Sequence, residues 1–266
     1  MKEKIISIIN QKGGVGKTTT VINLAAGLSI KEKKILVIDL DPQGNATTGL
    51  GLSNVNNSDK TIYDVLNGTK KISEVICKTN INNLDVITSN VDLSGLEVET
   101  AGDNRRAFIL KDQIMAYLND SGASYDYVLI DCPPSLSLLT IMALVASNSL
   151  VVPLQTEFFA LEGLTQLMKT IERIKSNLNT ELNIKGILLT MYDKRNKLSS
   201  QVEKEARQYF KYKVYRTVVP RNVRLSEAPS HGVPVLIYDK SCSGSKSYFN
   251  FTEEFLNQEK IMESAA

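Results

Sequence analysis

The feature that most restricts the fold is a glycine-rich loop between an apolar run and a helical pattern. Residues 11–20 read QKGGVGKTTT and follow the run IISII, which starts at Ile5. A helix beginning at about Gly16 would place four apolar residues on one face: Val21, Leu24, Ala25 and Leu28. Backbone N–H groups of such a loop, together with the helix dipole, can surround a phosphate. The sequence therefore predicts a phosphate site where the first strand meets the first helix.

The rest of the chain repeats this alternation of strand and helix. Short apolar runs alternate with longer amphipathic stretches and start at Ile5, Ile35, Leu84, Val128, Leu150 and Ile184. This pattern predicts an α/β fold of the P-loop NTPase type, a doubly wound and mostly parallel sheet with helices on both faces. We expect a single domain over residues 1–266, with the more polar residues 51–83 forming an excursion outside the sheet core.

Composition excludes several other classes of protein. With 42% hydrophobic and 23% charged residues the chain can bury a large core, which excludes a disordered or collagen-like protein. Its three cysteines have no paired spacing, so neither a disulfide framework nor a zinc site is expected. The N-terminus lacks the pattern of a signal peptide, and no apolar run is long enough to span a bilayer. We therefore expect a cytoplasmic protein.

The loop departs from the strict P-loop pattern GxxxxGK[ST], because Gln11 stands where the first glycine belongs. In that pattern Lys17 contacts the β- and γ-phosphates and the Thr18 hydroxyl binds Mg²⁺. A second lysine, Lys12, precedes Lys17 by five residues. The alternative without a binding role is a glycine-rich turn whose lysines are simply exposed to solvent. Two lysines on one empty loop would repel each other, whereas a triphosphate with Mg²⁺ keeps enough negative charge for both.

Six stretches carry a resemblance to a known family. KGGVGKTT resembles the deviant Walker A loop of the ParA/MinD group of P-loop ATPases, and DLDPQGNATTGLG from Asp39 resembles its ParA branch, which includes the Soj proteins. DCPPSL, ALEGL, LLTMYD and VVPRNVRLSEAPSHG also match. The resemblance implies an ATP-sandwich homodimer, in which Lys12 reaches the nucleotide of the second subunit and Gly13 stays small to admit that partner. The expected ATP-binding loop residues are Lys12, Gly13, Gly14, Val15, Gly16, Lys17, Thr18 and Thr19.

Three carboxylates end two of the predicted strands. Asp39 and Asp41 follow the run at Ile35, and Asp131 follows the run at Val128. Carboxyl ends of parallel strands face the ligand crevice in this fold class, although capping of a loop or helix is a common alternative for each Asp. We expect Asp131 to hold Mg²⁺ through water, with Thr18 as the direct ligand, and the resemblance implies that Asp41 orients the attacking water. Lys12, Lys17 and Asp41 are the expected catalytic residues.

Positive charge is concentrated late in the chain. Residues 185–224 contain eleven Lys or Arg and three acids, a net charge of +8, while the whole chain carries only +2. No base-reading motif accompanies them, so contact with DNA phosphates independent of sequence is expected. Arg195 and Arg224 match DNA-binding positions of the family, and Lys194, Lys197 and Arg221 are added on charge alone. For residues 201–213 a solvated, locally paired helix face is an equal alternative.

The resemblance also assigns the partners and the overall function. It implies a chromosome or plasmid partitioning ATPase that binds nonspecific double-stranded DNA on the nucleoid. A ParB-type centromere-binding protein would stimulate its slow basal hydrolysis through a basic segment. Pro220 and Asn222 are the expected adenine contacts, whereas His231 and Cys132 are expected to be structural.

Other functions on the same fold stay open. A MinD-like membrane-associated ATPase of division-site placement would need a basic C-terminal helix, but the last seventeen residues hold four Glu and one Lys, so no membrane partner is expected. A metabolic phosphoryl or carboxyl transferase would need a small-molecule pocket in place of the cluster of positive charge in residues 185–224. An iron–sulfur reductase would need cysteine ligands from both subunits.

Overall fold

The computed structural model describes residues 4–52, 60–120 and 125–264, with side chains up to residue 261. Eight strands form one sheet in the order β3-β4-β2-β5-β1-β6-β7-β8. All neighbours are parallel except β3 and β4, which are antiparallel. The strands are β1 (Lys4–Ile8), β2 (Ile35–Asp39), β3 (Ile76–Lys78), β4 (Leu84–Ile87), β5 (Tyr127–Asp131), β6 (Ser149–Gln155), β7 (Asn183–Tyr192) and β8 (Val214–Pro220).

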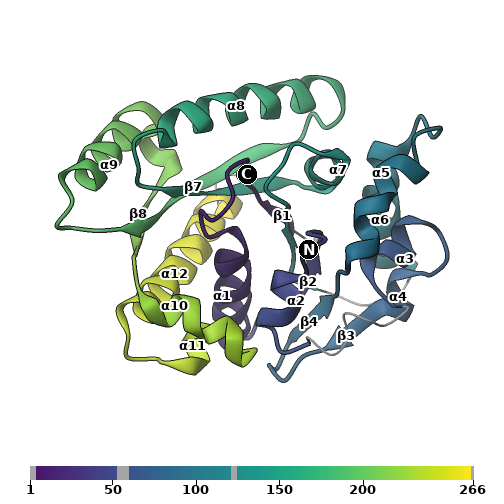
Figure 1. Cartoon of the computed structure of the whole chain (residues 1–266), viewed down its shortest axis with the longest axis horizontal. Coiled ribbons are helices and arrows are strands. Elements are labelled where there is room, and N and C mark those ends of the chain that lie inside the picture. The colour runs from purple at the N-terminus through teal and green to yellow at the C-terminus, as the bar shows by residue number, and fades with distance from the viewer. Residues whose placement is uncertain (1–3, 53–59, 121–124, 265–266) are drawn as a thin grey trace.

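Helices cover both faces of this sheet (Figure 1). One face is covered by α3 (Ile62–Leu66), α4 (Ile72–Val75), α5 (Leu96–Glu99), α6 (Ile109–Asp120), α7 (Leu138–Ala146), α8 (Ala160–Asn177) and α9 (Lys197–Phe210). The other is covered by α1 (Lys17–Ile30), α2 (Asn45–Gly49), α11 (Val235–Tyr238) and α12 (Ser243–Ser264). The short helix α10 (Val223–Glu227) follows β8. Short 3₁₀ turns are η2 (Val91–Gly95), η3 (Arg106–Phe108), η4 (Lys211–Lys213) and η5 (Ala228–His231).

Strand β1 shows how the sequence produces two apolar layers. Ile5 and Ile9 pack into one hydrophobic cluster, whereas Ile6 and Ile8 pack into the cluster on the opposite face. Side chains alternate across a strand, so an uninterrupted apolar run fits a strand that is covered on both faces. The doubly wound α/β fold predicted from these runs is confirmed, and all six predicted strands form.

We expected residues 51–83 to form an excursion outside the sheet core, and this was wrong in part. Residues 53–59 of this segment lie outside the described ranges. α3 and α4 pack into the core through Ile62, Val65, Ile72 and Val75. β3 adds an antiparallel edge strand next to β4. Each apolar piece in this segment is short, but its apolar residues are three apart and share one helix face, which is enough to bury them.

Helix α1 begins at Lys17 with Gly16 as its N-cap, close to the predicted start. It is more buried than an amphipathic surface helix, because α12 lies beside it (Figure 1). The contact is close at Gly27, where an added Cβ would lie 2.2 Å from Thr252 Oγ1. Within the described residues, no helix is both long and apolar enough to cross a membrane.

Candidate functional site

The loop between β1 and α1 has the backbone shape of a phosphate cradle. Gly14 and Gly16 have φ angles of 74° and 90°, which residues with a Cβ rarely adopt. The Thr190 hydroxyl, from β7, donates to the Val15 carbonyl at 2.8 Å and fixes the loop against the sheet. The predicted glycine-rich turn at a helix N-terminus is therefore present, with its amides in position to meet an anion.

This loop forms one wall of a cleft of about 490 Å³. Predicted site residues that line it are Gly13, Gly14, Gly16, Lys17, Thr18, Thr19 and Asp41. The Lys17 ammonium donates to the Lys12 carbonyl at 3.1 Å. Burial lowers the pKa of Lys17, and the Asp131 carboxylate partly offsets this. Lys17 is thus held inside the loop by a single neutral acceptor, which a phosphate oxygen can replace.

Two carboxylates meet on neighbouring strands beside the loop. Asp39 of β2 and Asp131 of β5 are paired in the sheet register and are both 0% exposed. Asp39 accepts hydrogen bonds at 2.7 Å from both the Thr47 amide and hydroxyl. Burial raises the pKa of Asp39 to about 6 despite these donors. Asp41 lies two residues further on, at the cleft, where it accepts from the Gln43 amide at 3.0 Å.

Asp131 differs from Asp39, because neither of its carboxylate oxygens has a hydrogen-bond partner within the described residues. Burial, followed by the charge of Asp39, raises the pKa of Asp131 well above its usual range. A buried carboxylate without a partner is costly, and a hard cation is the ligand that relieves it. No group of three His, Cys, Asp or Glu residues with metal-site geometry occurs in the described ranges. The single buried carboxylate of Asp131 fits Mg²⁺, which commonly uses one carboxylate together with substrate phosphates.

Lys12 is a predicted nucleotide residue that does not line this cleft within the described residues, whereas Gly13 does line it. Lys12 forms an ion pair with Glu157, and its side chain is 54% exposed. An added Cβ on Gly13 would lie 3.7 Å from Pro134, an ordinary contact, so nothing within the described part of this single chain requires a glycine there. Pro220 ends β8, and Asn222 caps α10 by accepting from the Arg224 amide at 2.8 Å.

Neither Pro220 nor Asn222 lines the cleft among the residues described. Met191, Pro229 and Ser230 line it instead, and sequence reasoning did not single them out. The available signal was their place within the LLTMYD and SEAPSHG stretches. Met191 also has a φ angle of 50°, unusual for a residue with a side chain, directly at the cleft.

The predicted DNA-binding residues come together at the ends of two neighbouring strands. Tyr192 of β7 pairs with Pro220 of β8, and the Arg221 amide donates to the Tyr192 carbonyl at 3.1 Å. The cations that follow these strand ends are all exposed: Lys194, Arg195, Lys197, Arg221 and Arg224. We call this set the basic edge.

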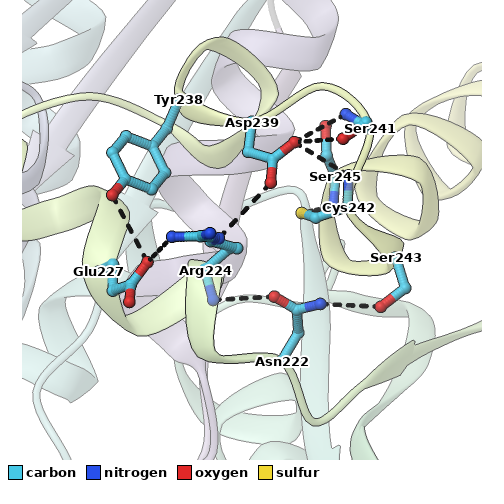
Figure 2. A network of polar contacts seen from close by, with 9 residues as sticks. All are labelled: Asn222, Arg224, Glu227, Tyr238, Asp239, Ser241, Cys242, Ser243 and Ser245. Atoms are coloured by element: carbon cyan, nitrogen blue, oxygen red, sulfur yellow. Dashed lines mark hydrogen bonds and ion pairs between the residues drawn. The ribbon is translucent and has the colours of Figure 1, made fainter.

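The two arginines of the basic edge already have acidic partners in the chain. Arg195 binds both carboxylate oxygens of Asp193, at 3.1 and 3.0 Å, and this holds the pKa of Asp193 at about 2. Arg224 contacts Glu227 at 2.6 Å and Asp239 at 3.6 Å (Figure 2).

Several other cations in residues 185–224 serve the fold. Lys185 is buried at the opposite end of β7 and pairs with Glu259 of α12. Arg207 binds Glu203 at 2.9 Å and the backbone carbonyls of Tyr215 and Arg216. The charge count therefore overstated the surface charge, and the solvated, locally paired alternative holds for Arg207.

The parallel sheet, the glycine loop at a helix N-terminus and the carboxylates at adjacent strand ends define a P-loop nucleotide-binding protein of the α/β class. A family model described as an AAA domain matches residues 3–184. The chain is 50% identical over 263 residues to the chromosome partitioning protein ParA of Caulobacter vibrioides, covering 99% of this chain and 97% of that protein. The chain belongs to the ParA/Soj family of chromosome-partitioning ATPases.

A second relative supports this assignment, and a solved structure supports the fold. The chromosome-partitioning ATPase Soj of Treponema pallidum is 49% identical over 253 residues, covering 95% of this chain and 97% of that protein. Among solved structures, cobyrinic acid a,c-diamide synthase of Mycobacterium smegmatis with an ATP analogue and magnesium superposes with a TM-score of 0.83. The two sequences are 30% identical, and the match covers 97% of this chain and 96% of the synthase chain. The same fold thus also carries a metabolic enzyme, so the basic edge matters for choosing between the two functions.

Proposed function

We propose that this chain binds ATP and Mg²⁺, dimerises on the nucleotide, coats double-stranded DNA without sequence preference and leaves it after hydrolysis. One observation carries the proposal. The phosphate loop follows β1 and the basic edge follows β7 and β8, so both occupy the carboxyl edge of one parallel sheet. A nucleotide in the cleft and a DNA backbone at the basic edge would therefore be close enough to influence each other.

At the nucleotide, the roles follow from the donors present. The loop amides and Lys17 would bind the phosphates, and Thr18 and Asp131 would hold Mg²⁺, whose positive charge would offset negative charge on the phosphoryl oxygens. Asp41 lines the cleft and orients the attacking water. Positioning by one carboxylate accelerates phosphoryl transfer only modestly without further cations, so basal hydrolysis is slow.

Dimerisation supplies a further cation. The exposed side chain of Lys12 extends from the loop outside its own cleft, where it can reach the nucleotide of a second copy. Gly13, which needs no small side chain within its own chain, lets that copy approach. A ParB-type partner that adds positive charge to this site would accelerate hydrolysis and return the protein to single copies.

DNA binding depends on the dimer because one copy makes few phosphate contacts. Arg195 and Arg224, with Lys194, Lys197 and Arg221, supply them, and two copies double their number. Such contacts carry no sequence information. This activity places the protein on the nucleoid and in chromosome or plasmid segregation.

The deciding experiment measures DNA affinity with no nucleotide, with ADP and with ATP, at two ionic strengths, beside liposome sedimentation with ATP. The proposal requires tight binding to random-sequence DNA only with ATP, and no liposome binding. Liposome binding would favour the MinD-like alternative. Equal DNA affinity in all three nucleotide states would reject the proposal that ATP controls DNA binding.

Two variants separate the steps. Asp41→Ala should keep ATP-dependent dimers and DNA binding but lose turnover. Arg224→Glu should lose DNA and keep dimers, while Arg216→Glu, an equal charge reversal in the amino-terminal half of β8, should retain DNA. Full turnover in the first variant removes Asp41 from the mechanism, and unchanged DNA retention in the second removes Arg224 from the surface.

A further inference from the structure

Arg224 is the centre of a polar network that joins three helices (Figure 2). Its guanidinium contacts Glu227 in its own helix, at 2.6 Å, and Asp239 at the end of α11, at 3.6 Å. Tyr238 donates its hydroxyl to the same Glu227 oxygen at 3.5 Å. The arginine proposed to face DNA is therefore oriented by two carboxylates of its own chain.

Asp239 is itself fixed by donors in the short segment between α11 and α12. Its Oδ1 accepts from the Ser241 amide at 3.0 Å, the Ser241 hydroxyl at 2.7 Å and the Cys242 amide at 3.2 Å. These donors, led by the Ser241 hydroxyl, hold the pKa of Asp239 below its usual range, so the group stays ionised. Its other oxygen, Oδ2, is the one nearest to Arg224. A rigid anion thus stands beside the arginine.

A second link joins the same elements. Asn222 accepts from the Arg224 amide at 2.8 Å and donates to the Ser243 hydroxyl, also at 2.8 Å. The first turn of α10 is thereby tied to the first turn of α12. Side chain and backbone of Arg224 are both connected to the junction between α11 and α12.

The other end of α10 leads into the nucleotide cleft. Glu227 is the last residue of α10, and its carbonyl accepts from the Ser230 hydroxyl at 2.7 Å. Ser230 and its neighbour Pro229 line the cleft. The cleft wall is therefore joined by a hydrogen bond to the helix that carries both Arg224 and Glu227.

We propose that Glu227 and Asp239 are positioning residues that retain Arg224 in an internal ion pair and so make DNA contact depend on the nucleotide. This rests on the proposed role of Arg224 as a DNA contact. Exposed ion pairs contribute little to stability, so a DNA phosphate can replace them. A nucleotide that shifts α10 weakens the internal pair and releases the guanidinium to DNA. By linkage, DNA then favours the nucleotide state that releases Arg224.

The test uses the full chain with the double substitution Glu227→Gln and Asp239→Asn. Both replacements keep the side-chain shape, and Asp239→Asn keeps an acceptor oxygen for the Ser241 and Cys242 amides. Affinity for a random-sequence duplex is measured by fluorescence anisotropy without nucleotide and with ATP. We expect affinity without nucleotide to rise about three- to tenfold, the range of one weak ion pair replaced, and affinity with ATP to change less than about twofold. Nucleotide dependence therefore falls, while ATP affinity is retained.

Glu203→Gln is the matched control for Glu227→Gln alone, because each removes one negative charge from an acid that pairs with an arginine; Glu203 pairs with Arg207 in α9. It should leave the ratio of the two DNA affinities unchanged. The Glu227→Gln substitution alone leaves the hydrogen bonds of Asp239 to Ser241 and Cys242 intact, so it reports the same effect if the double variant folds poorly.

The decisive comparison repeats the acid substitutions in an Arg224→Ala background. If the acids act through Arg224, they have no further effect there. An effect that persists, or an equal rise with and without ATP, means simple charge repulsion and overturns the inference. If Arg224→Ala itself binds DNA like the wild type in every nucleotide state, the proposed DNA surface fails and the inference fails with it.

Discussion

The nucleotide cleft and the basic edge occupy the same edge of the sheet but have opposite burial. Asp39 and Asp131 beside the cleft are 0% exposed, and Asp131 has no hydrogen-bond partner within the described residues. At the basic edge the side chains of Arg195 and Arg224 are 91% and 51% exposed, and both have acidic partners. The cleft therefore needs a ligand to neutralise its buried carboxylate charge. At the basic edge, acidic partners in the chain already neutralise much of the arginine charge.

This difference determines how each region responds to its ligand. A ligand that relieves a buried, unpartnered charge binds the folded state strongly and stabilises it. A ligand that replaces exposed ion pairs gains little per contact and must make many of them. The cleft is thus suited to a tight small ligand, and the basic edge to a long polyanion whose binding is easily reversed.

The largest expected effect comes from Lys17→Ala. Loss of this ammonium removes a charge-assisted contact to phosphate in a low-dielectric cleft, so ATP affinity should fall about a thousandfold. Titration with a fluorescent ATP analogue and Mg²⁺ measures it.

Lys33→Ala, at the far end of α1, is the control for this prediction, since Lys33 pairs at the surface with Asp126 at 3.6 Å. It should bind ATP like the wild type. If Lys17→Ala lowers ATP affinity less than about tenfold, the loop amides bind the phosphate without the lysine. The difference in burial between the two regions would then not explain how they bind their ligands.

Salt should separate the two regions by a smaller factor. If Arg195 and Arg224 of two copies make about four phosphate contacts, DNA affinity should fall about a hundredfold between about 50 and 200 mM salt. ATP affinity, measured over the same range, should change only a few-fold because buried pairs are poorly screened. Equal salt slopes for the two ligands would remove the distinction between a buried and an exposed site.

The phosphate loop and the strand-end carboxylates could be located from the sequence because their determinants are local. Gly16, Lys17 and Thr18 are consecutive at a strand-to-helix turn, and Asp39 and Asp131 end apolar strands whose carboxyl ends must share one edge. Strand β8 was missed because its polar residues interrupt the apolar run, and its strand character depends on pairing with β7.

Contacts between distant segments could not be predicted in the same way. Pairing of Lys12 with Glu157 depends on how the loops after β1 and β6 fold side by side. The cleft wall at Met191 and Pro229 requires the ends of β7 and η5 to meet the loop. Charge counting failed at Lys185 for the same reason, since only packing of α12 against β7 shows that this lysine is buried.

The smallest expected effect is on the pH dependence of stability. It tests whether carboxylates of the two regions change stability with opposite sign as pH rises. Asp39 has a folded pKa of about 6, above the unfolded value of 3.8. Between these values the folded chain holds a proton that the unfolded chain has released, so stability should fall as pH rises from about 4 to about 6. Asp193 has a folded pKa of about 2, so its contribution should be lost as pH falls below about 4.

Urea denaturation of the nucleotide-free protein in EDTA across this range measures both slopes. Asp39→Asn should reduce the first slope and leave the part due to Asp131, whose pKa is also raised. Asp193→Asn should change only the acid limb, and by less, because its partner Arg195 is 91% exposed and solvent screens the pair. ATP with Mg²⁺ should flatten the first slope, since a cation at Asp131 favours the ionised carboxylate. Stability independent of pH between about 4 and 6 would mean that Asp39 is ionised throughout and that burial does not govern the nucleotide edge.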